Sequence, residues 1–272
     1  MVLLEIKDKE LFDKVKKTIS NLVGFDCSQY SDTFVARRVE VRLRANSMDS
    51  LGDYNALLQK SEDERKSLSK ELSIHVTNFF RDKEMWLVFK DEVIPTLARL
   101  KQEKKLSRVT VWSAGCSSGE EPLSIAICFL EAGIQRLTVN IVATDIDPAT
   151  VERAKNAEYE EQQFREADPK LKDRYFSDAG DGLFKANPEL LRMIQYKAAD
   201  IHAFRPANID IIFCRNTVIY FSLTAKSKLY GDFYDCLNAG GFFIMGKTEV
   251  LQGPARDKFQ IFDPKERVYF KE

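Results

Sequence analysis

The chain has 272 residues, of which 44% are hydrophobic and 31% charged, and its formal net charge at pH 7 is −1. This composition indicates a folded globular protein, long enough for two domains or one large α/β unit, and a charge so close to zero argues against a surface built to bind nucleic acid. No apolar run approaches the length of a membrane span, and the N-terminal segment soon becomes charged, so we expect a cytoplasmic protein.

Five cysteines are spread along the chain without a C-x-x-C pair: Cys27, Cys116, Cys128, Cys214 and Cys236. With only two histidines, His75 and His202, the sequence offers no ligand set for a structural zinc ion, and we expect no metal site. Cys116 and Cys214 fall in loops near the expected ligand site. A nucleophilic role would need a neighbouring base, and the sequence reveals none.

The first 70 residues are expected to form a small helical bundle. Apolar residues recur at helical spacing between Leu11 and Val23, again between Phe34 and Arg44, and a third time after Ser50. The middle helix has a basic flank, formed by Arg37, Arg38, Arg42 and Arg44. That flank is either a docking face for an acidic partner or a solvated face whose arginine stems cover the core. The residues alone favour the second.

Residues 71–107 are expected to be a linker and a connecting helix. Asp82 directly precedes a helical pattern that runs from Met85 to Leu100, and it is a candidate N-cap for that helix. The stretch from Lys101 to Ser107 is typical of a charged linker that leads into the first strand.

The most informative stretch begins with a β-branched strand that starts at Val109 and ends at Gly115. A small-residue loop follows, and Pro122 then opens an amphipathic helix, which makes this the first crossover of an open α/β sheet. Glu120 and Glu121 at the helix mouth would repel a pyrophosphate but attract a cation or a ligand ammonium group. Alternatively, they merely complement the helix dipole. The glycine spacing also departs from G-x-G-x-x-G, so the loop predicts a nucleotide-like ligand other than a dinucleotide.

A second strand, from Thr138 to Asp145, ends on an acidic residue and leads into a helix at Asp147-Pro148. An acid at the end of this strand is placed to accept hydrogen bonds from ribose hydroxyls. A plain turn aspartate is the alternative, and the neighbouring glycine loop weighs against it. Asp145 is therefore predicted to bind a ribose.

The remaining chain continues the α/β alternation, with an interruption between residues 157 and 198. There, turn residues from Ser177 to Gly182 separate Arg174-Tyr175-Phe176 from Leu183-Phe184-Lys185 and predict an antiparallel hairpin. Further strands are expected at 193–198, 209–216 and 242–245, with a helix over 224–237 and a closing hairpin over 258–262 and 267–270. A parallel sheet finished by an antiparallel hairpin is the architecture of the class I S-adenosylmethionine-dependent methyltransferases, a Rossmann-like α/β fold.

Four motifs make the chain similar to one family of these enzymes. They are Thr77-x-Phe79-Phe80-Arg81, Trp112-Ser113-Ala114-Gly115-Cys116-Ser117-Ser118-Gly119-Glu120-Glu121-Pro122, Ala143-Thr144-Asp145-Ile146-Asp147 and Phe213-Cys214-Arg215-Asn216-x-x-Ile219-Tyr220-Phe221. They occur in the family's order, and the likeness extends from the helical N-terminal domain to the last strand. The chain thus resembles the chemotaxis receptor glutamate O-methyltransferases of the CheR type.

The resemblance implies an enzyme that transfers the methyl group of S-adenosylmethionine to glutamate side chains on the cytoplasmic coiled coils of chemoreceptors. The cofactor-binding set carried over by motif is His75, Thr77, Arg81, Gly115, Glu120, Asp145, Asp200, Ile201, Arg215 and Asn216. Within it, Thr77, Arg81 and Glu120 would surround the methionine end of the cofactor. The Asp200-Ile201 turn would border the adenine, and Arg215 and Asn216 would close the site.

Two residues, Arg81 and Tyr220, are implied to be catalytic, with Tyr220 near the transferred methyl group. Arg81 would orient the carboxylate of the cofactor or that of the substrate, and the sequence does not separate these roles. A glutamate carboxylate is already ionised near neutral pH, so the reaction needs no general base. Positioning against the sulfonium and desolvation of the two charges would then supply most of the catalysis.

The sequence departs from the family pattern in two places. His75 stands where many relatives have Asn, and the turn from Ser177 to Gly182 is short. Members that grip a peptide tether at the receptor's C-terminus carry a longer loop here, so we expect this chain to work without that tether. Given the family, Arg37, Arg38, Arg42 and Arg44 become candidate receptor contacts.

The expected organisation is a receptor-docking domain over residues 1–70, a connecting segment over 71–107 and a methyltransferase domain over 108–272, with the β insertion near 172–192. We expect it to act as a monomer.

Three other functional classes were weighed. An RNA or DNA methyltransferase should end this strand on Asn/Asp-Pro-Pro-aromatic or supply a Pro-Cys nucleophile, whereas the tip here is Cys214-Arg215-Asn216. A nicotinamide oxidoreductase is disfavoured by the acids in the loop. A catalytically silent, cofactor-binding signalling module is disfavoured by the presence of Arg81 and Tyr220.

Overall fold

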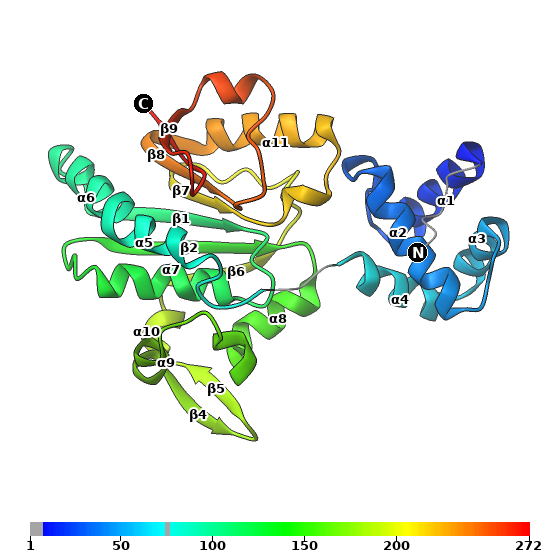
Figure 1. Cartoon of the computed structure of the whole chain (residues 1–272), viewed down its shortest axis with the longest axis horizontal. Coiled ribbons are helices and arrows are strands. Elements are labelled where there is room, and N and C mark those ends of the chain that lie inside the picture. Colours follow the sequence, from blue (N-terminus) through cyan, green and yellow to red (C-terminus); the bar gives the residue numbers. More distant parts are fainter. Residues whose placement is uncertain (1–7, 74–76) are drawn as a thin grey trace. The chain divides into compact units, whose positions relative to one another are not determined.

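The computed structural model describes residues 8–73 and 77–272 (Figure 1). By their contacts the described residues form two compact units. The first holds residues 8–73 together with Tyr220–Lys226, and the second holds residues 77–219 together with Ser227–Glu272. Residues 77–107, expected as a linker and helix, therefore pack within the second unit.

The first unit is a bundle of helices, as the hydrophobic spacing predicted. It contains α1 (Lys9–Leu22), a short 3₁₀ turn (Cys27–Gln29), α2 (Asp32–Ala45), α3 (Leu51–Lys60) and α4 (Glu62–Leu72). Each α-helix starts where a side-chain oxygen of Asp8, Ser31, Ser50 or Ser61 accepts a hydrogen bond from a first-turn amide. Such caps satisfy amides that have no partner inside the helix.

A buried carboxylate joins three elements of this bundle. Glu64 of α4 is 6% exposed and accepts hydrogen bonds from Arg42 of α2 at 2.9 and 2.7 Å and from the Tyr54 hydroxyl of α3 at 2.9 Å. Burial raises the pKa of Glu64, but the bonds from Arg42, Asn46 and Tyr54 outweigh it and hold the pKa below its usual value. Arg42 is thus committed to the interior of the bundle.

A distant segment of the chain also belongs to the first unit. The amide of Ser31 donates to the carbonyl of Tyr220 at 3.0 Å, and the amide of Ser222 donates to the carbonyl of Gln29 at 2.9 Å. The rings of Phe34 and Tyr220 lie 5.1 Å apart. The sequence had assigned this segment to the sheet domain, because the pairing spans almost two hundred residues and leaves no local signal.

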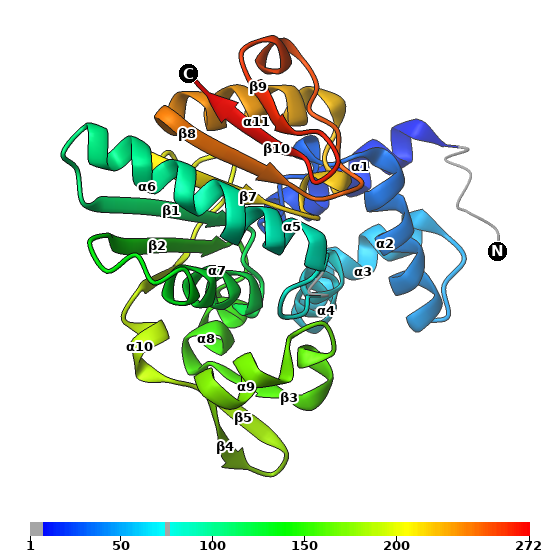
Figure 2. The same cartoon turned by 60° about the vertical axis from the view of Figure 1, so that its left-hand side comes forward.

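The second unit is built on a seven-stranded sheet in the order β6-β2-β1-β7-β8-β10-β9 (Figure 2). Its strands are β1 (Arg108–Ala114), β2 (Thr138–Asp145), β6 (Ile194–Ala198), β7 (Ile209–Cys214), β8 (Leu237–Met245), β9 (Gln260–Asp263) and β10 (Val268–Lys271). Strands β6, β2, β1, β7 and β8 pair in parallel, and β10 runs antiparallel to both of its neighbours. The expected parallel sheet with a closing hairpin is confirmed.

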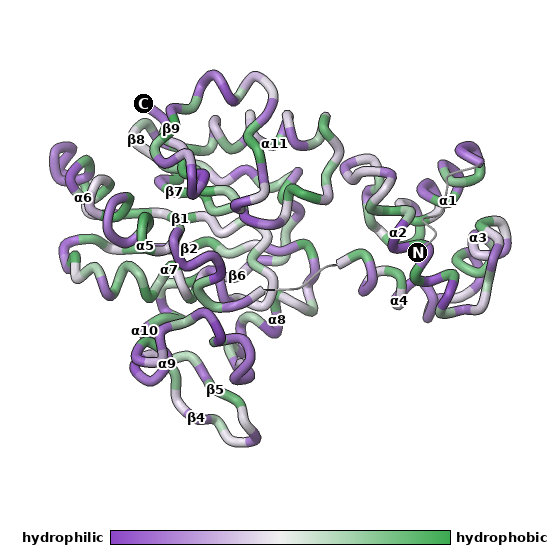
Figure 3. Tube along the Cα trace, in the orientation of Figure 1, coloured by the Kyte–Doolittle hydropathy of each residue, from purple (hydrophilic) through white to green (hydrophobic). Residues whose placement is uncertain are grey.

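Helices cover both faces of this sheet. One face packs against α5 (Lys83–Val88), a π-helical turn (Phe89–Val93), α6 (Ile94–Glu103), α7 (Glu120–Glu131) and α8 (Pro148–Asn156), and α11 (Leu223–Cys236) covers the other. The side chains of β1 point alternately to these two faces. Val111 packs into the hydrophobic core that contains residues of α5, α6 and α7, and Trp112 packs against Phe233 of α11. Along the chain, hydrophobic residues concentrate in these strands (Figure 3).

One expectation around α6 was wrong. The helix continues to Glu103, so Lys101 is part of it rather than of a linker. Lys101 is 8% exposed, and its ammonium group lies 2.7 Å from a carboxylate oxygen of Asp210 at the start of β7. In the sequence, Lys101 cannot be told apart from the other charged residues of the stretch that ends at Ser107.

The insertion is a three-stranded antiparallel sheet in the order β3-β5-β4. It comprises β3 (Glu158–Glu160), a 3₁₀ turn (Glu161–Phe164), α9 (Pro169–Tyr175), β4 (Phe176–Gly180), β5 (Leu183–Ala186) and α10 (Pro188–Leu191). The predicted hairpin is confirmed as β4 and β5. Strand β3 was not foreseen, and Arg174 and Tyr175 end a helix instead of beginning the hairpin.

Within the described residues, no helix has the length and apolarity to cross a bilayer.

Candidate functional site

The carboxyl ends of β1 and β2 meet at a tightly turned loop. The amides of Gly115 and Cys116 both donate to the carbonyl of Thr144 at 2.8 Å, which folds the loop back over β2. Gly115 has a φ of +88°, and a Cβ there would lie 2.5 Å from the Thr217 hydroxyl oxygen. Only glycine allows the β1 loop and the β7 loop to approach so closely.

Asp145 shapes this loop as well as facing it. It ends β2, is 9% exposed, and accepts hydrogen bonds from the amides of Ser117 at 2.8 Å and Asp147 at 3.1 Å. These two bonds fix the carboxylate at the carboxyl end of β2, the edge of a parallel sheet at which ligands bind. The turn after β6 lies alongside, because the amide of Ala199 donates to the carbonyl of Asp145 at 2.9 Å. Asp200 and Ile201 follow directly.

Glu120 is a fully buried carboxylate in the first turn of α7. Its side chain accepts hydrogen bonds from the Ser118 hydroxyl at 2.8 and 3.0 Å and from the side-chain amide of Gln163. Burial raises the pKa of Glu120, and these donors and Arg153 oppose the rise. A buried carboxylate that is held in one orientation can bind a ligand's ammonium group through an ion pair.

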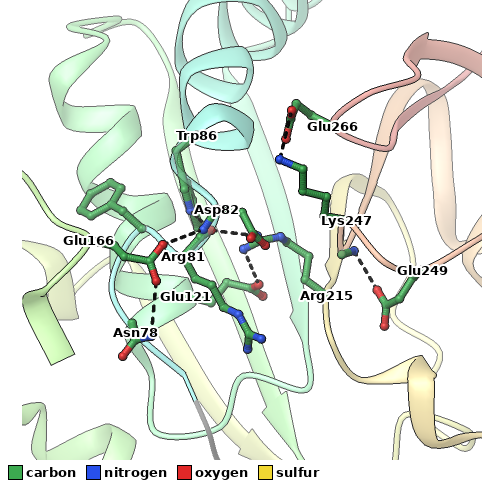
Figure 4. Close-up of polar contacts among 12 residues, drawn as sticks. Asn78, Arg81, Asp82, Trp86, Glu121, Glu166, Arg215, Lys247, Glu249 and Glu266 are labelled. Atoms are coloured by element: carbon green, nitrogen blue, oxygen red, sulfur yellow. Dashed lines mark hydrogen bonds and ion pairs between the residues drawn. The ribbon is translucent and has the colours of Figure 1, made fainter. Parts of the chain in front are cut away.

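Glu121 and Arg215 form a second charged contact (Figure 4). The Ser113 hydroxyl donates to Glu121 at 2.8 Å, and an Arg215 nitrogen lies 3.7 Å from the other carboxylate oxygen. Burial raises the pKa of Glu121, while Arg215 and the Ser113 hydrogen bond lower it. Serving only the helix dipole would not require these partners, so Glu121 also fastens α7 to the tip of β7.

Arg215 is held by the loop that precedes α5. Its side chain is 4% exposed and donates to the Asp82 carboxylate and to the Arg81 carbonyl, both at 2.8 Å. Its guanidinium lies 5.6 Å from the centre of the Trp86 ring. The side chain of Asp82 makes no capping bond to α5, so its expected role as an N-cap was wrong. Arg215 connects two loops of the site.

Sequence reasoning missed Glu249, which lies after β8. Glu249 is 3% exposed and accepts hydrogen bonds from the amides of Gly246 at 2.7 Å and Val218 at 3.1 Å. It therefore anchors the loop that carries Asn216, whose φ is +57°. A single glutamate four residues beyond a strand gives no sign of this role in a sequence.

The remaining predicted site residues are His75, Thr77, Arg81 and Tyr220. His75 lies outside the described residues. Thr77 is half-buried and Arg81 contributes its carbonyl as noted above. Tyr220 belongs to the first unit, so its role near the methyl group stays a prediction.

The four arginines of α2 are not equivalent. Arg38 pairs with Glu71 at 2.8 Å and Arg42 with the buried Glu64, whereas Arg37 and Arg44 are exposed. Arg44 also pairs with Glu40 of its own helix. The predicted basic flank thus divides into two arginines that hold the bundle together and two that face solvent.

Thiol and metal chemistry find no support in the described part of the chain. Residues 8–73 and 77–272 contain no group of three or more His, Cys, Asp or Glu side chains arranged to hold a metal ion. All five cysteines are free and buried. Burial raises the pKa of Cys116 and of Cys214 well above its usual value, so neither thiol is a ready nucleophile.

Comparison with known proteins gives a consistent result. Residues 75–268 match the family model described as "CheR methyltransferase, SAM binding domain", and residues 10–73 match "CheR methyltransferase, all-alpha domain". A "Chemotaxis protein methyltransferase" of Listeria innocua is 33% identical over 92% of both chains. Proteins of the same description from Vibrio parahaemolyticus and, numbered 1, from Vibrio cholerae are each 30% identical over 96% of both chains. The solved structure of a magnesium protoporphyrin IX methyltransferase from Synechocystis is 14% identical and aligns with a TM-score of 0.34. The alignment covers 67% of this chain and 78% of that chain, and the likeness is too weak to carry an argument.

Proposed function

The chain belongs to the CheR methyltransferase family, and from that membership we propose that it methylates glutamate side chains in the cytoplasmic coiled coil of chemoreceptors. The products would be glutamate methyl esters and S-adenosylhomocysteine. Receptor domains of this kind lie in the cytoplasm, which is where we place the enzyme.

The residues of the site fit S-adenosylmethionine. The observation that carries this fit is the pair of buried acids beside one glycine loop. Asp145 ends β2, and Glu120 accepts hydrogen bonds from the side chains of Ser118 and Gln163. We assign the ribose hydroxyls to Asp145. Glu120 would receive the ammonium group of the cofactor, and the close approach at Gly115 leaves backbone amides near the ligand. When bound, the cofactor supplies an electrophilic methyl group on a sulfonium.

The protein's own contribution is to position and desolvate the substrate carboxylate. A glutamate is ionised near neutral pH, so the reaction requires no base beside the site. We propose that Arg81 orients a carboxylate and that Tyr220 lines the path of the methyl group. Arg215 would act differently from our first expectation, since one of its terminal nitrogens donates to both Asp82 and the carbonyl of Arg81. It would keep the loop of Arg81 against the site.

Replacing Asp145 by asparagine tests the cofactor assignment. Asparagine keeps the size of the side chain and one acceptor for the amide of Ser117, but it removes the charge and replaces the oxygen that accepts from the amide of Asp147. We expect the dissociation constant for S-adenosylhomocysteine, measured by calorimetry, to rise by about tenfold or more. Asp178→Asn, an exposed change in the hairpin, is the control. Equal affinity of the Asp145 variant and the wild type would remove Asp145 from the ribose site.

Methyl transfer itself can be tested with a purified receptor cytoplasmic fragment and S-adenosylmethionine labelled in the methyl group. Label that enters the fragment and is released by mild base as methanol indicates carboxylate esters. A fragment in which the methylated glutamates are replaced by alanine should accept none. Label that resists base, or that enters RNA instead, would contradict the proposed substrate.

Receptor docking is best tested at the exposed arginines of α2. Reversing Arg38 and Arg42 would set new carboxylates beside Glu71 and Glu64 and destabilise the bundle, which obscures any effect on docking. For Arg37→Glu with Arg44→Glu, we expect kcat/KM for the receptor to fall by about tenfold at low salt, with unchanged cofactor affinity. Lys60→Glu with Lys70→Glu makes the same charge change at exposed sites of α3 and α4. Equal losses in both double variants would refute a specific role for α2.

The remaining partner assignments rest on the insertion and on the size of the chain. Only Asp181 and Gly182 connect β4 to β5, so the turn offers little length to enclose a peptide. We propose that the enzyme acts as a monomer and without a receptor tether. Removing the C-terminal peptide from the receptor should then leave the methylation rate unchanged.

A further inference from the structure

One segment of the insertion, residues 159–166, touches both loops that form the proposed cofactor site. The Tyr159 hydroxyl donates to the carbonyl of Ser118 at 2.9 Å, and the amide of Phe79 donates to the carbonyl of Gln163 at 3.0 Å. The amide of Asp82 donates to the Glu166 carboxylate at 3.1 Å (Figure 4). This segment thus supports the glycine loop after β1 and the loop before α5 together.

Gln163 is central to these contacts because its side chain uses both ends of its amide. The amide oxygen accepts a hydrogen bond from the backbone of Glu160 at 2.8 Å, and the amide nitrogen donates to Glu120. A rotation that exchanged oxygen and nitrogen would break both bonds. The side chain is therefore fixed as a donor toward Glu120.

Glu120 depends on that donor because few other groups surround it. The Ser118 hydroxyl is its other side-chain donor, and Arg153 of α8 acts on it through space. Tyr159, Tyr196 and Cys116 also interact with it, and burial raises the pKa of each of them, so they stay neutral near pH 7. Without Gln163, the buried carboxylate would keep one side-chain donor.

We propose that Gln163 is a positioning residue for the cofactor: it holds the Glu120 carboxylate in the orientation that receives the ligand's ammonium group. The inference rests on the proposed function, since it assigns that ammonium group to Glu120. The insertion then has a role inside the cofactor site in addition to any role toward a receptor. Its first turn and the glycine loop form one binding element.

The proposal predicts that Gln163→Met weakens ligand binding to an extent that depends on the ligand and on the pH. S-adenosylhomocysteine carries the ammonium group, whereas 5′-methylthioadenosine has the same nucleoside without the amino-acid end. In Gln163→Met the dissociation constant for S-adenosylhomocysteine should rise by about tenfold or more, the effect of losing a bond to a charged group. That for methylthioadenosine should stay within about twofold of the wild type, as for a neutral surface change.

The pH profile separates this role from a merely structural one. Burial already raises the pKa of Glu120, and removing a donor to its ionised form raises the pKa further. Because the ionised form binds the ammonium group, affinity for S-adenosylhomocysteine is lost as the pH falls through this pKa. In the variant that loss should begin at a higher pH than in the wild type.

The controls lie in the same turn. Gln162→Met changes an exposed glutamine whose amide bonds only to Glu160, and it should leave both affinities unchanged. Should Gln163→Met fold poorly, Gln163→Asn keeps a polar amide that is one methylene too short to reach Glu120, and it should show the same selective loss. Equal weakening of both ligands, or of neither, would overturn the proposal. A wild-type protein that binds neither ligand would instead overturn the proposed function.

Discussion

Replacing Arg215 by methionine should lower the free energy of unfolding of the sheet unit by about 3 kcal/mol, the cost of leaving buried carboxylates without their partner. The side chain is 4% exposed and lies against Asp82 and Glu121, whose side chains are 28% and 13% exposed. Methionine keeps much of the volume beside Trp86 but leaves both acids unpaired. Trp86 and Trp112, the chain's two tryptophans, both lie in this unit, so tryptophan fluorescence during urea unfolding reports on it alone.

The stability that Arg215→Met loses should be smaller at acid pH than at neutral pH. Burial raises the pKa of Glu121 and Arg215 lowers it, so the variant raises that pKa further. A carboxyl whose pKa is raised on folding contributes stability below its unfolded pKa, and that stability is lost as the pH rises through the folded pKa. Ser113, Glu249 and Arg81, which also act on Glu121, are unchanged. The variant should therefore be less impaired at acid pH than at neutral pH.

A surface arginine provides the comparison. Arg174 pairs with Glu131 at 2.8 Å, but its side chain is 66% exposed. Arg174→Met should change the free energy of unfolding by about 0.5 kcal/mol or less, as most exposed ion pairs do. If the two variants lost similar stability, the contact between Arg215 and the acids would not be the buried ion pair that we describe.

The second large effect is expected at Gly119, which precedes α7 with a φ of +100°. A Cβ there would lie 2.8 Å from the Tyr159 hydroxyl oxygen, 2.9 Å from that of Tyr196 and 3.1 Å from the Cβ of Ala154. The Tyr159 ring is buried and its hydroxyl is bonded to the carbonyl of Ser118, so it cannot swing aside as a flexible side chain would, whereas Tyr196 is half-buried. Gly119→Ala must therefore shift the loop between Asp145 and Glu120, and cofactor affinity should fall by about tenfold or more.

Two further variants isolate the cause. Gly133 also has a positive φ, +65°, but a Cβ there would meet nothing within 4 Å. Gly133→Ala should therefore leave cofactor affinity unchanged. Tyr196→Phe removes an oxygen that would crowd the new methyl group, so Gly119→Ala with Tyr196→Phe should recover part of the lost affinity. Additive losses in calorimetry would mean that the hydroxyl is not what excludes alanine.

Much of the fold was predictable because its signals are local. Alternating helical and β-branched patterns gave the strands β1, β2, β7 and β10 and the helices α1, α2 and α3 to within a few residues. The sequence also predicted that Asp145 would end a strand and that Glu120 would lie at the start of the helix after β1, and the structure confirms both positions. Motifs then identified the family, which the matches over residues 10–73 and 75–268 confirm.

The contacts that position the site were not predictable in this way. Asp82 resembles a helix cap in the sequence but binds Arg215, which lies 133 residues further along the chain. Gln163 lies in a polar turn and Glu249 in a loop, and each finds its partner only when distant elements pack. Arg42 resembles a surface arginine until Glu64 is placed beside it.

The sequence by itself determined the architecture, the family and the chemical types gathered at the strand ends, because spacing and residue type act within a few positions of the chain. Only the tertiary structure decided which charged side chains pair with one another inside the protein and which remain available to a ligand or a receptor. That division depends on burial and on partners far away in sequence, since a charge is worth most where water is excluded.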